Sequence, residues 1–127
     1  MAGARKVLIV DDDEHVGAVI SKIAARHNAS VEIANDGKEA LIALRNSERF
    51  DAIILDLHMP GITGWDVFAS IEKDPRMALV PIIIISGFPL STEEMEKLAG
   101  RATAFVDKET FDILEFESLL DQLLENA

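Results

Sequence analysis

The chain has no cysteine, and it has no apolar run long enough to cross a membrane. Without cysteine, the chain cannot form disulfides, thiolate zinc sites, iron–sulfur clusters or a cysteine nucleophile. Folding therefore needs no oxidising compartment. The first apolar run, Val7–Val10, is shorter than the apolar core of a signal peptide. We therefore expect a cytoplasmic protein that makes no contact with a membrane.

Positive charge is also scarce. The chain has 12 lysines and arginines against 23 aspartates and glutamates, which gives a formal net charge of −11. Nucleic acids and anionic membranes attract lysine and arginine, so direct binding to either is not expected. No glycine-rich phosphate loop follows any apolar run, which argues against a nucleotide-binding module.

The length of 127 residues fits one domain spanning 1–127, and 49% hydrophobic residues are enough to form a packed core. Short apolar runs alternate along the chain with helical patterns. The runs are Val7–Val10, Val31–Ala34, Ala52–Leu55, Pro81–Ile85 and Thr103–Val106. Three of them are nearly continuous in valine and isoleucine, as is typical of parallel strands that are buried on both faces.

Helix-start signals separate these runs. Each is a capping residue followed three positions later by an acid: Asp36 and Glu39, Thr63 and Asp66, and Ser91 and Glu94. Asp13 is expected to begin the first helix, and Trp65 is expected to pack on the third. Strict alternation of strand and helix predicts an α/β fold, a five-stranded doubly wound parallel sheet of the flavodoxin-like (βα)5 type.

Ligands of such sheets bind outside the carboxyl ends of the strands. The polar residues that follow the apolar runs are Asp11, Asp12, Asp13, Asp56, Ser86, Asp107 and Lys108. Crowded carboxylates repel one another unless a cation lies among them, and ligands that are all oxygen favour Mg²⁺. A carboxylate, a hydroxyl, a lysine and Mg²⁺ suit phosphoryl transfer, in which the carboxylate can be the nucleophile.

Four segments carry a resemblance to a known family. VLIVDDDE, IILDLHMPGITGWDV, PIIIISG and AFVDK occur in this order over nearly the whole chain. Together they resemble the receiver domain of two-component response regulators, in particular the stand-alone receivers that are like chemotaxis regulators. Whether this receiver stands alone or was excised from a larger regulator or hybrid kinase stays open.

The resemblance implies a role for several residues. Asp56 matches the phosphoacceptor, and Asp11 and Asp12 match the acidic pair that holds Mg²⁺, for which Mn²⁺ can substitute. Asp56 itself and the backbone carbonyl of His58 would complete the protein ligands, while the His58 imidazole is expected to have no catalytic duty. Four further positions would serve phosphoryl binding and switching: Ser86, Gly87, Lys108 and the aromatic Phe105. The family usually has a proline with a cis bond after this lysine, where the chain has Glu109.

The resemblance also implies partners. A sensor histidine kinase or phosphotransfer protein would phosphorylate Asp56, and the domain would catalyse only its own phosphorylation and dephosphorylation. A downstream protein, or a second copy in a homodimer, would bind the face of the fourth helix, fifth strand and fifth helix. One alternative is a pseudo-receiver that binds partners without phosphorylation. A small Mg²⁺-dependent phosphohydrolase is less favoured, because that class reads Asp-x-Asp-x-Thr after its first strand.

Overall fold

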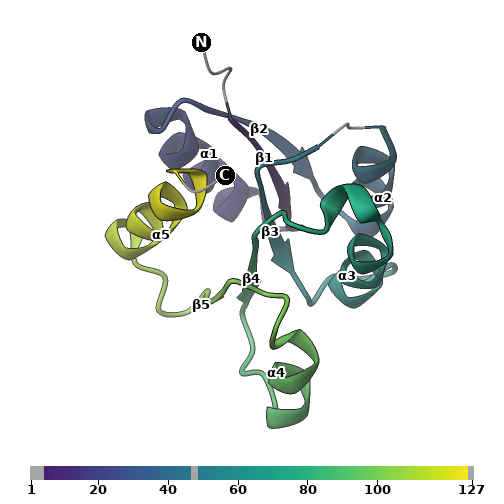
Figure 1. Cartoon of the computed structure of the whole chain (residues 1–127). Helices are drawn as coiled ribbons and strands as arrows, with labels where there is room; N and C mark the ends of the chain where they lie inside the picture. The colour runs from purple at the N-terminus through teal and green to yellow at the C-terminus, as the bar shows by residue number, and fades with distance from the viewer. Residues whose placement is uncertain (1–4, 47–48, 126–127) are drawn as a thin grey trace.

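A computed structural model describes residues 5–46 and 49–125, in which strands and helices alternate (Figure 1). The elements are β1 (Arg5–Val10), α1 (Glu14–Arg26), β2 (Ala29–Ala34), α2 (Gly37–Asn46), β3 (Ala52–Asp56), α3 (Gly64–Lys73), β4 (Ile82–Ser86), α4 (Thr92–Leu98), β5 (Ala104–Asp107) and α5 (Ile113–Glu125). The sequence analysis missed one element, the short 3-10 helix η1 (Pro75–Met77) before β4. Within the described ranges, no helix combines the length and apolar character needed to cross a membrane.

The five strands form one parallel sheet in the order β2-β1-β3-β4-β5, which confirms the predicted fold class. Val10 of β1 lies opposite Leu55 of β3, so Asp11 and Asp56 follow at the same level of the sheet. Ser86 of β4 lies opposite Asp107 of β5. The register therefore places the polar residues along one edge, at the carboxyl ends of the strands.

Alternate strand residues face two separate cores. One core packs α1 and α5 against one face of the sheet, and the other packs α2 and α3 against the opposite face (Figure 1). The first includes Val7, Ile9, Ile20, Ile54, Ile83, Phe116 and Leu120. The second includes Leu8, Val10, Leu44, Ile53, Leu55, Val67, Phe68 and Ile84. Both faces are covered, as the continuous apolar runs predicted.

The predicted helix starts are present. Asp13 accepts backbone hydrogen bonds from His15 and Val16 at the start of α1. Capping boxes begin α3, with Thr63 and Asp66, and α4, with Ser91 and Glu94. At the start of α2, Asp36 accepts from the Glu39 N–H at 2.7 Å, whereas the Glu39 carboxylate accepts from the N–H of Asn35.

The edge formed by α4 and β5 is thinly packed. The α4 helix has seven residues, of which only Leu98 is buried, and it projects from the sheet in Figure 1. Along β5, half-buried and exposed residues alternate. A cavity of about 280 Å³ lies beside them, next to the β4–α4 loop. This edge is therefore the part of the sheet with the most room for movement.

Candidate functional site

Three carboxylates meet at the carboxyl ends of β1 and β3. Asp11, Asp12 and Asp56 each place an oxygen within 4.8 Å of the others. Asp56 is the last residue of β3, and Asp11 directly follows β1; both are buried, at 2% and 1% exposed. Asp12 is exposed. The sheet thus fixes two of these acids, while the third lies at the mouth of the site.

Lys108 joins the two buried acids. Its Nζ donates a hydrogen bond to Asp11 Oδ1 at 2.9 Å and another to Asp56 Oδ2 at 3.1 Å. Lys108 follows β5, an edge strand of the sheet. It therefore brings a positive charge from that edge to Asp11 and Asp56 at the ends of the central strands β1 and β3. The ammonium group offsets only part of the negative charge, because three carboxylates surround one cation.

Asp11 remains incompletely satisfied. Lys108 Nζ lies 2.9 Å from its Oδ2, yet that buried oxygen accepts no hydrogen bond. Burial raises the pKa of Asp11, and the nearby charge of Asp56 adds to this, although hydrogen bonds from Lys108 and the Asp13 N–H oppose it. Burial alone would lower the pKa of Lys108, but the hydrogen bonds to Asp11 and Asp56 outweigh it, so the pKa is raised.

These features fit a divalent cation of the Mg²⁺ type. Mg²⁺ prefers carboxylate and carbonyl oxygens together with water. The cluster offers carboxylate oxygens from Asp11, Asp12 and Asp56, and Asp11 Oδ2, which accepts no hydrogen bond, is a ready ligand atom. A cation there would also relieve the repulsion between buried carboxylates.

Backbone contacts hold Asp56 in place. The N–H of His58 donates to Asp56 Oδ1 at 3.0 Å, so each carboxylate oxygen of Asp56 has a donor. Behind the acid, Gly64 at the start of α3 lies so close that an added Cβ would collide with the Asp56 carbonyl oxygen and the Leu57 Cα. The sequence analysis missed Gly64, whose one signal was a glycine directly after the capping residue Thr63.

Ser86 and Gly87 lie at the end of β4. Ser86 is buried, and its hydroxyl makes hydrogen bonds with Phe88 and His58, but none with Asp56 or Lys108. A Cβ on Gly87 would meet only the Lys108 Cδ, at 3.8 Å, so this position has room for a small group. The structure thus brings Ser86 to the predicted end of the sheet, but its hydroxyl is hydrogen-bonded to Phe88 and His58.

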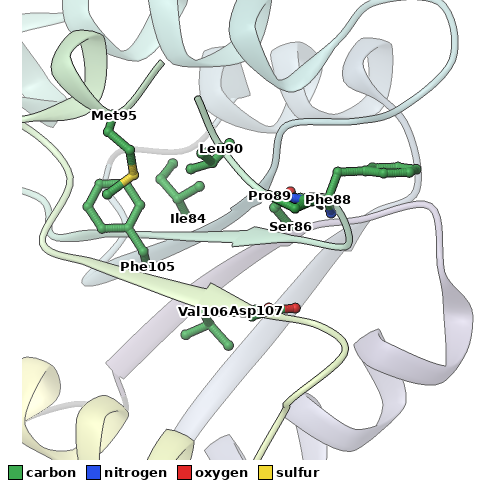
Figure 2. A pocket seen from close by; sticks show the side chains of 9 residues that line it. All are labelled: Ile84, Ser86, Phe88, Pro89, Leu90, Met95, Phe105, Val106 and Asp107. Carbon is green, nitrogen blue, oxygen red and sulfur yellow. Dashed lines mark hydrogen bonds between the residues drawn. The ribbon is translucent and has the colours of Figure 1, made fainter. Parts of the chain in front are cut away.

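Phe105 lies apart from the carboxylates, on β5, and is 40% exposed. Its ring lines the cavity beside the β4–α4 loop, with Met95 at the same end, whereas the Phe88 ring extends on the opposite side (Figure 2). Ile84, Leu90 and Val106 supply apolar walls. The cavity connects the position of Ser86 with that of Phe105, because both residues line it.

The segment after β5 differs from the family pattern. The described residues contain no cis peptide bond, so the Lys108–Glu109 bond is trans. Asp107 is exposed and accepts a hydrogen bond from the Glu109 N–H at 2.8 Å. The Asp107 carboxylate is therefore engaged with the loop, and only Asp11, Asp12 and Asp56 form the acidic cluster.

Known proteins resemble this chain in sequence and in fold. Residues 7–120 match the family model of the response regulator receiver domain. A two-component response regulator of rice, ORR8, is 30% identical over 80% of this chain and 84% of its own length. The gliding motility regulatory protein of Myxococcus xanthus is 28% identical over 93% of this chain, but the chain spans only 15% of that protein's length.

Solved structures of response regulators have a similar fold. A chemotaxis protein of Vibrio cholerae, CheY4, superposes with a TM-score of 0.82 at 29% identity, covering 96% of this chain and 100% of that one. The response regulator TrrA of Thermotoga maritima, solved in complex with Mg²⁺ and BeF, gives 0.78 at 27% identity, covering 94% and 99%. The chain therefore belongs to the receiver domain family of two-component response regulators, which are signalling domains.

Proposed function

We propose that this receiver domain accepts a phosphoryl group on Asp56 from a histidine kinase or a phosphotransfer protein. The observation that supports this most is the bridge from Lys108 to Asp11 and Asp56, with Asp12 beside it. Such a cluster has a nucleophile, a positive charge and several carboxylate oxygens within one site. The match to the receiver domain family supports the same proposal, namely phosphorylation of an aspartate in this cluster.

The transfer needs little from the protein except position and charge. An oxygen of Asp56 attacks phosphorus, the new O–P bond forms, and the N–P bond to the donor imidazole breaks. Lys108 and the Ser86 hydroxyl would bind the phosphoryl oxygens, on which negative charge gathers. The small Gly87 leaves space beside them.

Asp11, Asp12, Asp56 and the backbone carbonyl of His58 would hold Mg²⁺, or Mn²⁺ in its place. The ion supplies positive charge that offsets repulsion between the carboxylates and the incoming phosphoryl oxygens. Asp11 contributes the buried oxygen that accepts no hydrogen bond. Exposed Asp12 would contribute from the open side of the site.

Phosphorylation would act on the face of α4, β5 and α5. A phosphoryl group gives the Ser86 hydroxyl a charged acceptor, which draws the β4–α4 loop inward. The cavity of about 280 Å³ gives Phe105 room to turn inward from its exposed position. A downstream protein, or a second copy of this chain, would bind the altered face. We expect the domain, spanning 1–127, to work in the cytoplasm with its kinase.

Intact-mass analysis after incubation with acetyl phosphate and Mg²⁺ tests the acceptor. We expect one added phosphate on the wild type and none on Asp56→Asn. Asp13→Asn is the matched control, because Asp13 caps α1 and asparagine caps helices equally well. A phosphate that persists on Asp56→Asn would show that the acceptor is another residue. Phosphotransfer from a panel of histidine kinases then identifies the donor.

A further inference from the structure

The Ser86 hydroxyl at the end of β4 is engaged by two residues, Phe88 and His58. It donates to the Phe88 carbonyl at 2.7 Å and accepts from the Phe88 N–H at 3.1 Å. His58 Nδ1 lies 3.2 Å from the same oxygen. A hydroxyl has one proton and two lone pairs. All three are used when His58 Nδ1 carries its proton and donates it to Ser86.

This arrangement holds the hydroxyl away from the acceptor. To bind a phosphoryl group on Asp56, Ser86 must take its proton from the Phe88 carbonyl and rotate. The residue is only 5% exposed, so water offers little replacement for the bonds that are lost. Breaking each hydrogen bond of the resting arrangement costs free energy, and this cost weakens the binding of the phosphoryl group.

His58 contacts this turn twice. Its ring nitrogen meets the Ser86 hydroxyl, and its ring packs edge-on against Phe88, with ring centres 5.2 Å apart at an angle of 74°. Phe88 and Ser86 both line the cavity, and the Phe88 ring extends on the side opposite Phe105 (Figure 2). The side chain of His58 therefore ties the loop after the phosphoacceptor to the loop after β4.

We propose that the His58 imidazole is a positioning residue that keeps Ser86 in its resting hydrogen-bonded state. It thereby opposes the move of Ser86 toward a phosphorylated Asp56. This proposal rests on the proposed function, because it concerns how the domain responds to a phosphoryl group. It adds a role for the imidazole, for which the sequence analysis expected none.

Beryllofluoride, a mimic of the phosphoryl group, gives the test. We expect His58→Ala to bind it about fivefold more tightly than the wild type in the presence of Mg²⁺, by calorimetry, because one neutral hydrogen bond no longer competes. His58→Asn places an amide nitrogen close to the position of Nδ1 and should restore the wild-type affinity. The His58 backbone carbonyl is the same in all three proteins.

A double-mutant cycle shows whether the effect passes through Ser86. In a Ser86→Ala background, His58→Ala should no longer change the affinity. Without any ligand, amide exchange at Phe88 should be faster in His58→Ala than in His58→Asn, because both variants lose the ring but only alanine loses the hydrogen bond to Ser86. Because His58 is exposed, neither His58→Ala nor His58→Asn should prevent folding.

The outcomes are distinct. If the wild type binds beryllofluoride and His58→Ala binds it equally well, the proposed role of His58 is wrong and the proposed function stands. An equal effect of His58→Ala with and without Ser86 also overturns it, because the ring would then act by another route. If the wild type binds no beryllofluoride, the proposed function falls, and this proposal falls with it.

Discussion

The centre of the sheet is more closely packed than its β5 edge. Every residue of β3 and β4 is buried, and helices cover both faces. Along β5 no residue is fully buried, and α4 buries only Leu98. The acidic cluster lies on the first region, whereas Phe105 and its cavity lie on the second.

The difference in packing suits two different functions, phosphoryl transfer and switching. Phosphoryl transfer needs carboxylates and an ammonium group held within fractions of an ångström, which a close-packed sheet provides. A switch needs a second arrangement at a small cost in free energy, which a thinly packed edge allows. Lys108 and Ser86 connect the regions: Lys108 follows β5 and reaches Asp11 and Asp56. Ser86 ends β4 and lines the cavity that Phe105 also lines.

Phenylalanine truncation should give the largest contrast. Phe116→Ala removes a ring that is 2% exposed in the core between α1, α5 and the sheet, and it should lower the free energy of unfolding by about 3–5 kcal/mol. Phe105→Ala removes the same group from a position that is 40% exposed, and it should cost about 1 kcal/mol or less. Urea unfolding measures both. Equal losses would contradict the contrast.

Glycine substitution should give the next largest effect. Gly64→Ala places a Cβ against the Asp56 carbonyl and should lower the free energy of unfolding by about 1–3 kcal/mol, and it should also slow phosphorylation from acetyl phosphate. Gly17→Ala in α1 is the control, because its Cβ meets only Ile33, at 3.5 Å. Alanine favours a helix, so the control should be neutral or stabilised. A harmless Gly64→Ala would show that α3 can move away.

The fold could be predicted because local signals agreed with one another. Continuous apolar runs identified the strands, and Thr63 and Ser91 marked helix starts that the structure contains. The parallel arrangement then predicted that the acids after the strands lie along one edge of the sheet. The η1 helix was missed, since three residues give no periodicity, and Asp74 at its start reads equally well as the end of α3.

The site was less predictable at the level of contacts. Sequence placed Asp56, Asp11 and Lys108 together, because each follows or ends a strand. It could not show that Ser86 bonds to His58, since that contact depends on the side-chain rotamers of two loops. It also gave no sign that Gly64 presses against Asp56, because a backbone approach leaves no mark except the glycine itself.

Removing the buried charge of Asp11 should stabilise the protein slightly. Asp11→Asn keeps an acceptor for the Asp13 N–H but removes a buried charge. The pKa of Asp11 is raised in the folded state, so the folded state holds its proton more tightly than the unfolded state, and stability falls as pH rises above 3.8. The variant should therefore melt a few degrees higher at pH 7 without Mg²⁺, and this gain should vanish below pH 3.8.

Two comparisons check the origin of that gain. Asp13→Asn changes an exposed acid that caps α1, so its melting temperature should stay close to that of the wild type. Added Mg²⁺ should raise the melting temperature of the wild type more than that of Asp11→Asn, because the variant lacks one ligand oxygen. A gain that persists at pH 3 would contradict burial of the Asp11 charge as the cause.

The smallest effect should come from the link between α4 and α3. Lys97 Nζ lies 5.9 Å from the centre of the Trp65 ring, and Trp65 packs against the core beside Phe68. An exposed contact of this kind contributes about 0.5–1 kcal/mol, so Lys97→Ala should speed amide exchange in α4 by roughly two- to fivefold. Lys97→Arg keeps the cation and should exchange like the wild type. Lys22→Ala alters an exposed lysine of α1, where a buried helix face holds the backbone, so exchange in α1 should not change. Equal acceleration in both helices would mean that α4 is no looser than α1, and the contrast between edge and centre would then rest on the side chains alone.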